Sequence, residues 1–190
     1  TGNGTLSGTL EADGSITLDL AQLTLTGDAT IDATIDATRS GNTAAGGDVT
    51  ITAPVIGNGS ARNFTVNAGT GGILDIQGNI GASNLVNNID FDALSFDYNG
   101  ALTSQGIVNI EMIDELFMSD TSSITTNGGA VDLITGGNLI LDNAIDSNGG
   151  NVTLNSDRDA DGMGGVMLEL ESGGGIRTLG GNIVIGGGSD

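Results

Sequence analysis

The residues whose types and spacing suggest chemistry lie in one acidic segment, which reads Asp-Arg-Asp-Ala-Asp-Gly at residues 157–162. Carboxylates on alternate residues, followed by a glycine at a sharp bend, form the first half of a common calcium-binding loop. Such a loop suits Ca²⁺ because the ion is coordinated by several oxygen atoms, which alternate residues of a tight turn can direct toward one point. We therefore predict that Asp157, Asp159 and Asp161 bind Ca²⁺, which would be the one cofactor of this chain.

The second half of such a loop is incomplete. Its twelfth position, where a bidentate carboxylate is expected, holds Leu168, and Glu169 comes one residue too late. Arg158 would also neutralise part of the acidic charge. The alternative to a Ca²⁺ site is therefore an acidic loop exposed to solvent.

Residues suited to catalysis are scarce. The chain has no His and no Cys, and its four basic residues, all Arg, are scattered along the sequence. A glycosidase needs only two carboxylates, but sugar sites usually also contain aromatic platforms, and the chain has no Trp and one Tyr. The four Phe side chains are predicted to lie in the core because they occur in strand-like alternation; they are Phe64, Phe91, Phe96 and Phe117. We expect no enzymatic activity.

The charge balance excludes several partners. Asp and Glu number 24 against 4 basic residues, so the formal net charge is −20. Such a chain has almost no cations to exchange for the counterions of a nucleic acid, and anionic membrane surfaces should repel it. No apolar run approaches the roughly 18 residues that span a bilayer. We therefore expect neither nucleic-acid binding nor membrane insertion, whereas divalent cations are natural partners.

A degenerate repeat organises the rest of the sequence. Three segments, 124–133, 145–154 and 176–185, read Ile-x-(Ser/Thr)-x-Gly-Gly-x-aliphatic-x-aliphatic. Shorter copies precede them at 46–51, 71–76 and 102–110. The second or single glycine of each copy recurs at a variable interval of roughly 20–35 residues, which suits a solenoid whose coils keep their strands and vary their loops.

Alternation after each glycine predicts which side chains face the core. The expected inward pairs are Val49/Ile51, Leu74/Ile76, Val108/Ile110, Val131/Leu133, Val152/Leu154 and Ile183/Ile185. The residue between the members of each pair is usually polar and would point outward. Stacking at about 4.8 Å would align the pairs into aliphatic columns. Each coil should hold three short strands, as in Val131–Ile134, Leu139–Leu141 and Ala144–Asp146.

We therefore predict an all-β chain, a right-handed parallel β-helix (β-solenoid) of about seven irregular coils. Residues 1–190 would form a single segment of a longer chain, with less regular coils over 1–45 and the Gly-Gly coils over 46–190. Strands are expected at 15–20 and 22–26, and 29–38 repeats a four-residue unit. Residues 110–118 could compete as a helix, but the flanking strands favour a strand.

The Ile-x-(Ser/Thr)-x-Gly-Gly-x-Val-x-Leu units resemble the repeats of filamentous-haemagglutinin-like exoproteins and other large bacterial adhesins. The resemblance is good over 124–185 and degenerate over 46–185. It implies a right-handed β-helix on the bacterial cell surface, exported through a dedicated outer-membrane partner, with an adhesion, scaffold or biofilm role. It supplies no receptor, because those repeats carry no universal binding residues.

These observations lead to one functional expectation and several alternatives. We expect a non-catalytic, extracellular shaft or spacer of a surface adhesin or filament, whose partners are neighbouring coils, copies of itself, and an unidentified receptor or glycan. A calcium-stabilised matrix or surface-layer component that self-assembles is the main alternative. The threonines at 24 and 26 and the unit at 29–38 also hint weakly at ice binding.

Overall fold

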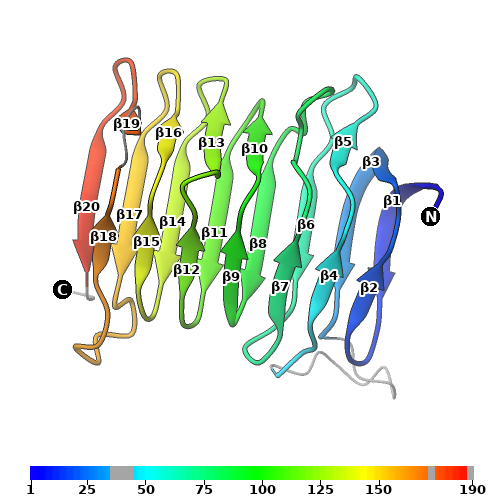
Figure 1. Cartoon of the computed structure of the whole chain (residues 1–190), viewed down its shortest axis with the longest axis horizontal. Coiled ribbons are helices and arrows are strands. Elements are labelled where there is room, and N and C mark those ends of the chain that lie inside the picture. The colour runs from blue at the N-terminus through cyan, green and yellow to red at the C-terminus, as the bar shows by residue number, and fades with distance from the viewer. Residues whose placement is uncertain (35–44, 171–173, 188–190) are drawn as a thin grey trace.

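The computed structural model describes residues 1–34, 45–170 and 174–187. This part of the chain contains 20 strands and no helix, and every pair of adjacent strands is parallel. The strands stack side by side along the long axis of the molecule, with the two chain ends at opposite ends of the stack (Figure 1). The predicted parallel β-solenoid of about seven coils is confirmed.

The strands form three sheets. The 9-stranded sheet consists of β1 (Asn3–Glu11), β3 (Gln22–Asp32), β6 (Phe64–Asn67), β8 (Ile89–Ala93), β11 (Val108–Met112), β14 (Val131–Thr135), β17 (Val152–Ser156) and β20 (Ile183–Gly187), with β5 (Val55–Gly57) beside β3. The 7-stranded sheet consists of β2 (Ile16–Leu18), β4 (Val49–Ile51), β7 (Ile73–Ile76), β9 (Ser95–Tyr98), β12 (Leu116–Met118), β15 (Leu139–Leu141) and β18 (Val166–Leu168). The 4-stranded sheet consists of β10 (Ala101–Ser104), β13 (Ser123–Thr126), β16 (Ala144–Asp146) and β19 (Ile176–Arg177).

Each regular coil passes once through each sheet. The coil made by β14, β15 and β16 has the three strands that the sequence predicts. Residues 110–118 form parts of β11 and β12, so the helical alternative is wrong. The strands expected at 15–20 and 22–26 are present as β2 and the first part of β3. The four-residue unit begins within β3, but 35–38 lie outside the described residues.

The core runs continuously along the stack, because alternate residues of most strands point inward, as in β11, β14 and β17. Val108 and Ile110 pair with Val131 and Leu133, and all four are fully buried. Most of the predicted inward pairs are buried in the same way. Ile183 and Ile185 are the exception at 46% and 50% exposure, because among the described residues β20 pairs only with β17.

The predicted pairs nevertheless belong to two columns and not one. Val49 pairs with Leu74 in the 7-stranded sheet, whereas Val108 lies in the 9-stranded sheet. The sequence pattern does not distinguish the two sheets. Glycine followed by alternating aliphatic residues occurs both at the corner before the 7-stranded sheet and at the corner before the 9-stranded sheet. A β-carbon on Gly72 would lie 2.3 Å from the carbonyl oxygen of Gly47, and each corner therefore has its own stack of glycines.

The Ser/Thr position of the repeat has a specific role at the corner before the 9-stranded sheet. The Thr126 hydroxyl donates to the carbonyl oxygen of Gly129 at 2.7 Å, and the Thr178 hydroxyl donates to that of Gly181 at 2.6 Å. These side chains are buried, so the hydroxyl satisfies a carbonyl group that would otherwise lack a partner. The repeat motif therefore encodes one recurring turn.

The aromatic side chains fill the middle of the core, with one exception. Phe91 contacts Phe64 and Phe96 edge to face, at centroid distances of 5.6 Å and 5.8 Å, and Phe96 also packs against Tyr98. The core prediction is wrong for Phe117. This residue lies between the inward-facing residues at either end of β12, so alternation directs it outward, where it is partly exposed.

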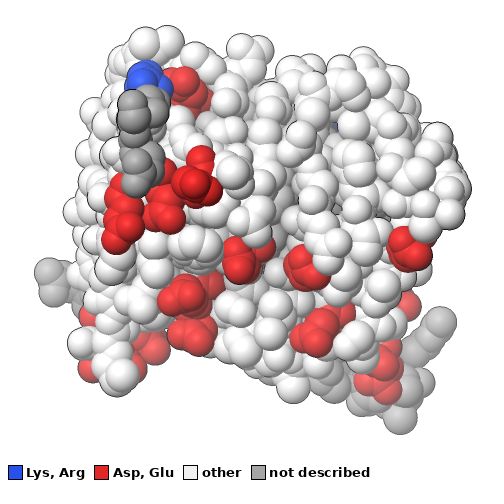
Figure 2. All heavy atoms as spheres, in the orientation of Figure 1, with Lys and Arg blue, Asp and Glu red and all other residues white. Residues whose placement is uncertain are grey.

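Acidic side chains lie along the length of the face viewed in Figure 2, whereas little basic surface is visible on it, in one small area toward the C-terminal end of the stack. The outward column of the 9-stranded sheet is chemically mixed, since Thr65 pairs with Asp90, which pairs with Asn109. Such a column is no regular threonine array of the kind that ice binding would need.

Candidate functional site

The segment with the predicted Ca²⁺ ligands connects β17 to β18 at a corner between two sheets. In Figure 1 this orange connection extends beyond the ends of the neighbouring strands. Carboxylate oxygens of Asp157, Asp159 and Asp161 lie within 4.8 Å of one another; Asp157 is half-buried and the other two are exposed. The structure thus brings the three predicted ligands together.

Local hydrogen bonds hold the loop in this shape. Asp157 adopts a left-handed backbone conformation (φ 53°), and its Oδ1 accepts a hydrogen bond of 3.0 Å from the backbone N–H of Gly162. The backbone N–H of Arg158 donates to the carbonyl oxygen of Thr135 on the preceding coil. The loop thus presents three carboxylates close together, and oxygen ligands of this kind suit a hard cation.

The fourth acidic ligand is not close by. Leu168 lies in β18, and Glu169 donates its backbone N–H to Leu141 as part of the same sheet. Within the described part of the chain, the three aspartates form a group whose carboxylate oxygens lie within 4.8 Å of one another, and Glu169 does not belong to this group. A bound Ca²⁺ would complete its coordination with backbone oxygens and water.

The side chain of Arg158 points away from its own loop. Its Nη1 forms an ion pair with Oε2 of Glu111, which is 47 residues earlier in the sequence and two coils away in the stack. The sequence suggested that Arg158 neutralises the aspartates beside it, but the ion pair that the structure gives is with Glu111.

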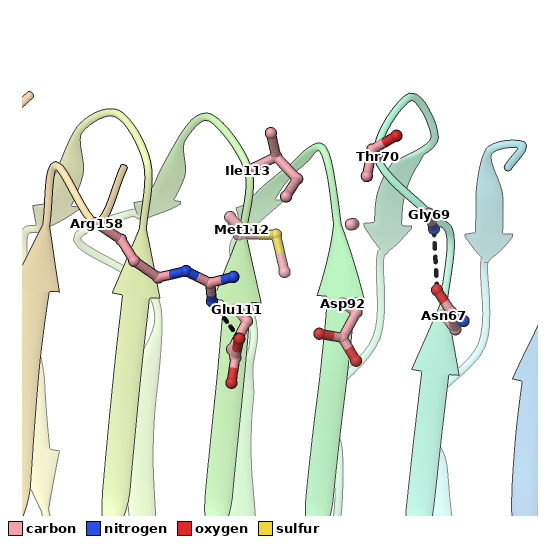
Figure 3. A pocket seen from close by; sticks show the side chains of 9 residues that line it. Asn67, Gly69, Thr70, Asp92, Glu111, Met112, Ile113 and Arg158 are labelled. Carbon is pink, nitrogen blue, oxygen red and sulfur yellow. Dashed lines mark hydrogen bonds and ion pairs between the residues drawn. The ribbon is translucent and has the colours of Figure 1, made fainter. Parts of the chain in front are cut away.

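This ion pair lies at the rim of a cleft that sequence analysis missed (Figure 3). The cleft has a volume of about 230 Å³ and lies where β6, β8 and β11 end. Strand register aligns Asn67 with Asp92 and Asp92 with Glu111, so three polar residues form a row across adjacent coils. The remaining lining residues are Gly69, Thr70, Ala93, Met112, Ile113 and Arg158.

The electrostatics of the cleft are dominated by acids. Burial, followed by the neighbouring charges of Asp90 and Glu111, raises the pKa of Asp92 to about 6, and Arg158 opposes that rise. Both burial and like charges disfavour the ionised form of a carboxyl group, and burial is the larger cause for Asp92.

Tyr98 is also perturbed but does not open onto a site. Burial raises the pKa of its phenol above its usual range. Its hydroxyl lies 3.0 Å from the carbonyl oxygen of Ala101, to which it donates a hydrogen bond within the fully buried core. Tyr98 is therefore a structural residue.

Comparisons with known proteins add no assignment. No protein-family model matches the chain, and no curated protein and no solved structure is significantly similar to it. Among the described residues, no helix is long and apolar enough to cross a membrane.

Proposed function

We propose that this chain is a non-catalytic structural shaft or spacer of a secreted bacterial surface adhesin or filament. The observation that carries the proposal is the single-file stack of coils. Each strand pairs with the strand of the next coil, and one buried hydrophobic core runs along the stack from Ile16 to Leu154. In such a stack each coil contacts only its neighbours, so length can change without change of fold.

The distribution of aromatic side chains supports a non-catalytic role. Phe64, Phe91, Phe96 and Tyr98 are fully buried, which leaves the partly exposed Phe117 as the aromatic side chain directed outward. A saccharide-cleaving site would need more stacking surface than one phenylalanine provides.

A deletion of one coil tests the spacer proposal. Thr126 and Ser147 occupy equivalent positions on adjacent coils and are 21 residues apart. Removal of the 21 residues 131–151 would therefore delete one coil, join Ala130 to Val152 and place β17 beside β11. We expect this variant to keep its β-rich circular dichroism spectrum and a cooperative melt, and to be shorter by about 4.8 Å. The matched control, removal of 131–141, disrupts the strand register and should prevent folding. Loss of fold in both variants would contradict the proposal.

The second candidate function is a calcium-stabilised matrix or surface-layer component that self-assembles outside the cell. The close approach of Asp157, Asp159 and Asp161 favours it. Light scattering coupled to size exclusion separates the two candidates. A shaft stays monomeric when millimolar Ca²⁺ is added, whereas a matrix component forms larger species that a chelator dissolves.

A further inference from the structure

The cleft beside Asp92 exists because one coil is unusually short. Only 19 residues separate Asn88 from Ile107, which occupy equivalent positions on adjacent coils, whereas 25 separate Asn63 from Asn88. The connection from β8 to β9 consists of Leu94 alone, while longer turns follow β6 and β11. The neighbouring turns therefore project on both sides of a recessed corner, as Figure 3 shows.

Two carboxylates on adjacent strands line the cleft. Asp92 and Glu111 are paired in register, and Asp90 lies two residues before Asp92 on the same outward side of β8. Among the described residues, Arg158 is the one cation that lines the cleft, and it pairs with Glu111. In Figure 3 its guanidinium points toward Glu111, and Asp92 lies beyond Glu111 on the next strand. The cleft thus has one more carboxylate than it has cations.

The walls of the cleft fit a carbon chain. Ala93, Met112 and Ile113 are the apolar lining residues. Ala93 and Met112 are almost fully buried, so the accessible apolar surface comes from Ile113, which is 47% exposed although it is a large hydrophobic residue. The described residues that line the cleft include no aromatic side chain, so a stacked sugar or base is a poor match. In the described part of the chain, the three acidic groups close enough to share a metal ion are those of the loop and not those of the cleft.

We propose that this cleft binds a primary ammonium group on an aliphatic chain, with Asp92 as the main anionic contact and Ile113 against the methylene groups. The ammonium group would come from a free aliphatic amine or from a lysine side chain of a peptide. This site is independent of whether the solenoid serves as a shaft.

Calorimetric titration of the intact chain tests the proposal with two probes, 1,5-diaminopentane and the tripeptide Gly-Lys-Gly with blocked ends. We expect saturable binding of at least one probe and no binding of pentane-1,5-diol, which has the same length without charge. Tighter binding of the tripeptide identifies a lysine side chain as the source, and tighter binding of the diamine identifies a free amine. Absence of saturable binding of both probes at millimolar concentration would overturn the proposal.

Three variants distinguish the cleft from general attraction to an acidic protein. Asp92→Asn should weaken binding about tenfold, because a charge-assisted hydrogen bond is lost. Arg158→Gln should strengthen binding, since it removes the competing cation. Asp75→Asn, on the outside of the 7-stranded sheet, removes the same charge elsewhere and should leave affinity within about twofold. Equal weakening by Asp92→Asn and Asp75→Asn would overturn the proposal, provided that circular dichroism shows all variants folded.

Discussion

Gly129 lies so close to Gly106 on the preceding coil that a β-carbon on Gly129 would come within 1.9 Å of the carbonyl oxygen of Gly106. The same contact recurs one coil later, where a β-carbon on Gly150 would lie 2.0 Å from the carbonyl oxygen of Gly129. Backbone occupies the space of the missing side chain, so glycine is required here by the spacing of the coils. The preceding residue, Gly128, is required for a different reason, because its φ of 91° suits glycine.

The first prediction concerns this stack of glycines. Gly129→Ala should reduce the free energy of unfolding by about 3 kcal/mol or more, because the backbone of one coil must move away from the next. Gly165→Ala is the matched control, since a β-carbon there would meet no atom within 4 Å. Denaturant unfolding of both variants measures the difference. Similar stabilities for the two variants would show that the coils are not packed as described.

A second prediction concerns the buried hydroxyl of Thr126, which lies 2.7 Å from the carbonyl oxygen of Gly129 and 3.0 Å from that of Ser147. Thr126→Val keeps the shape of the side chain but removes the donor, so it should destabilise the chain by about 1–3 kcal/mol. Thr125→Val changes the adjacent, outward-facing residue and should have an effect below about 0.5 kcal/mol. An equal cost for both would mean that the hydroxyl does not stabilise the turn.

The third prediction follows from the raised pKa of Asp92. Between the ordinary carboxyl pKa of 3.8 and about 6, the folded chain binds more protons at this site than the unfolded chain, so this carboxyl lowers stability as pH rises through that window. Asp92→Asn removes the effect. Its stability relative to wild type should therefore increase from pH 4 to pH 7, by about 1 kcal/mol once solvent screening of the half-exposed group is considered.

Asp132→Asn, which removes an outward-facing charge from β14, controls for the loss of one negative charge from an acidic protein. Urea unfolding at several pH values provides the comparison. A constant difference between Asp92→Asn and wild type across this range would contradict the assignment of Asp92 as a carboxyl that burial and neighbouring acids disfavour.

The fourth prediction concerns Ca²⁺. If Asp157, Asp159 and Asp161 bind the ion, the melting temperature should be higher in millimolar Ca²⁺ than in chelator, because a ligand that binds only the folded state stabilises it. The double variant Asp157→Asn with Asp161→Asn should lose this difference. The double variant Asp75→Asn with Asp132→Asn should keep it. Equal melting temperatures of the wild-type chain in both buffers would contradict Ca²⁺ binding and favour the alternative, an acidic loop exposed to solvent.

The sequence was sufficient to predict the coil but not the alignment of the coils. Val131 and Leu133 are aliphatic, alternate with a polar residue and follow two glycines, so their inward orientation could be inferred from local pattern. The same local pattern surrounds Val49 and Ile51, yet these residues lie in a different sheet. Alternation reports which way a side chain points, but it does not report which face of the solenoid the strand belongs to.

The candidate sites differ in the same way. The three aspartates are neighbours in sequence, so their proximity could be predicted from spacing. The cleft could not, because Asp92, Glu111 and Arg158 are brought together only by the lengths of the coils between them. Between equivalent positions, those lengths are 19 residues from Ile89 to Val108, 23 from Val108 to Val131 and 21 from Val131 to Val152. No repeat of constant period therefore connects the three residues.

The most direct test of the proposed spacer is the distance between two spin labels at opposite ends of the stack. The chain contains no cysteine, so Thr9→Cys and Val184→Cys would introduce the only two labelling positions. Register connects these outward positions through seven successive strand pairings of the 9-stranded sheet. At about 4.8 Å per coil the labels should lie about 34 Å apart. A rigid spacer predicts one narrow distance distribution near that value, unchanged by Ca²⁺ or chelator. A broad distribution, or a maximum that moves when Ca²⁺ is added, would contradict it.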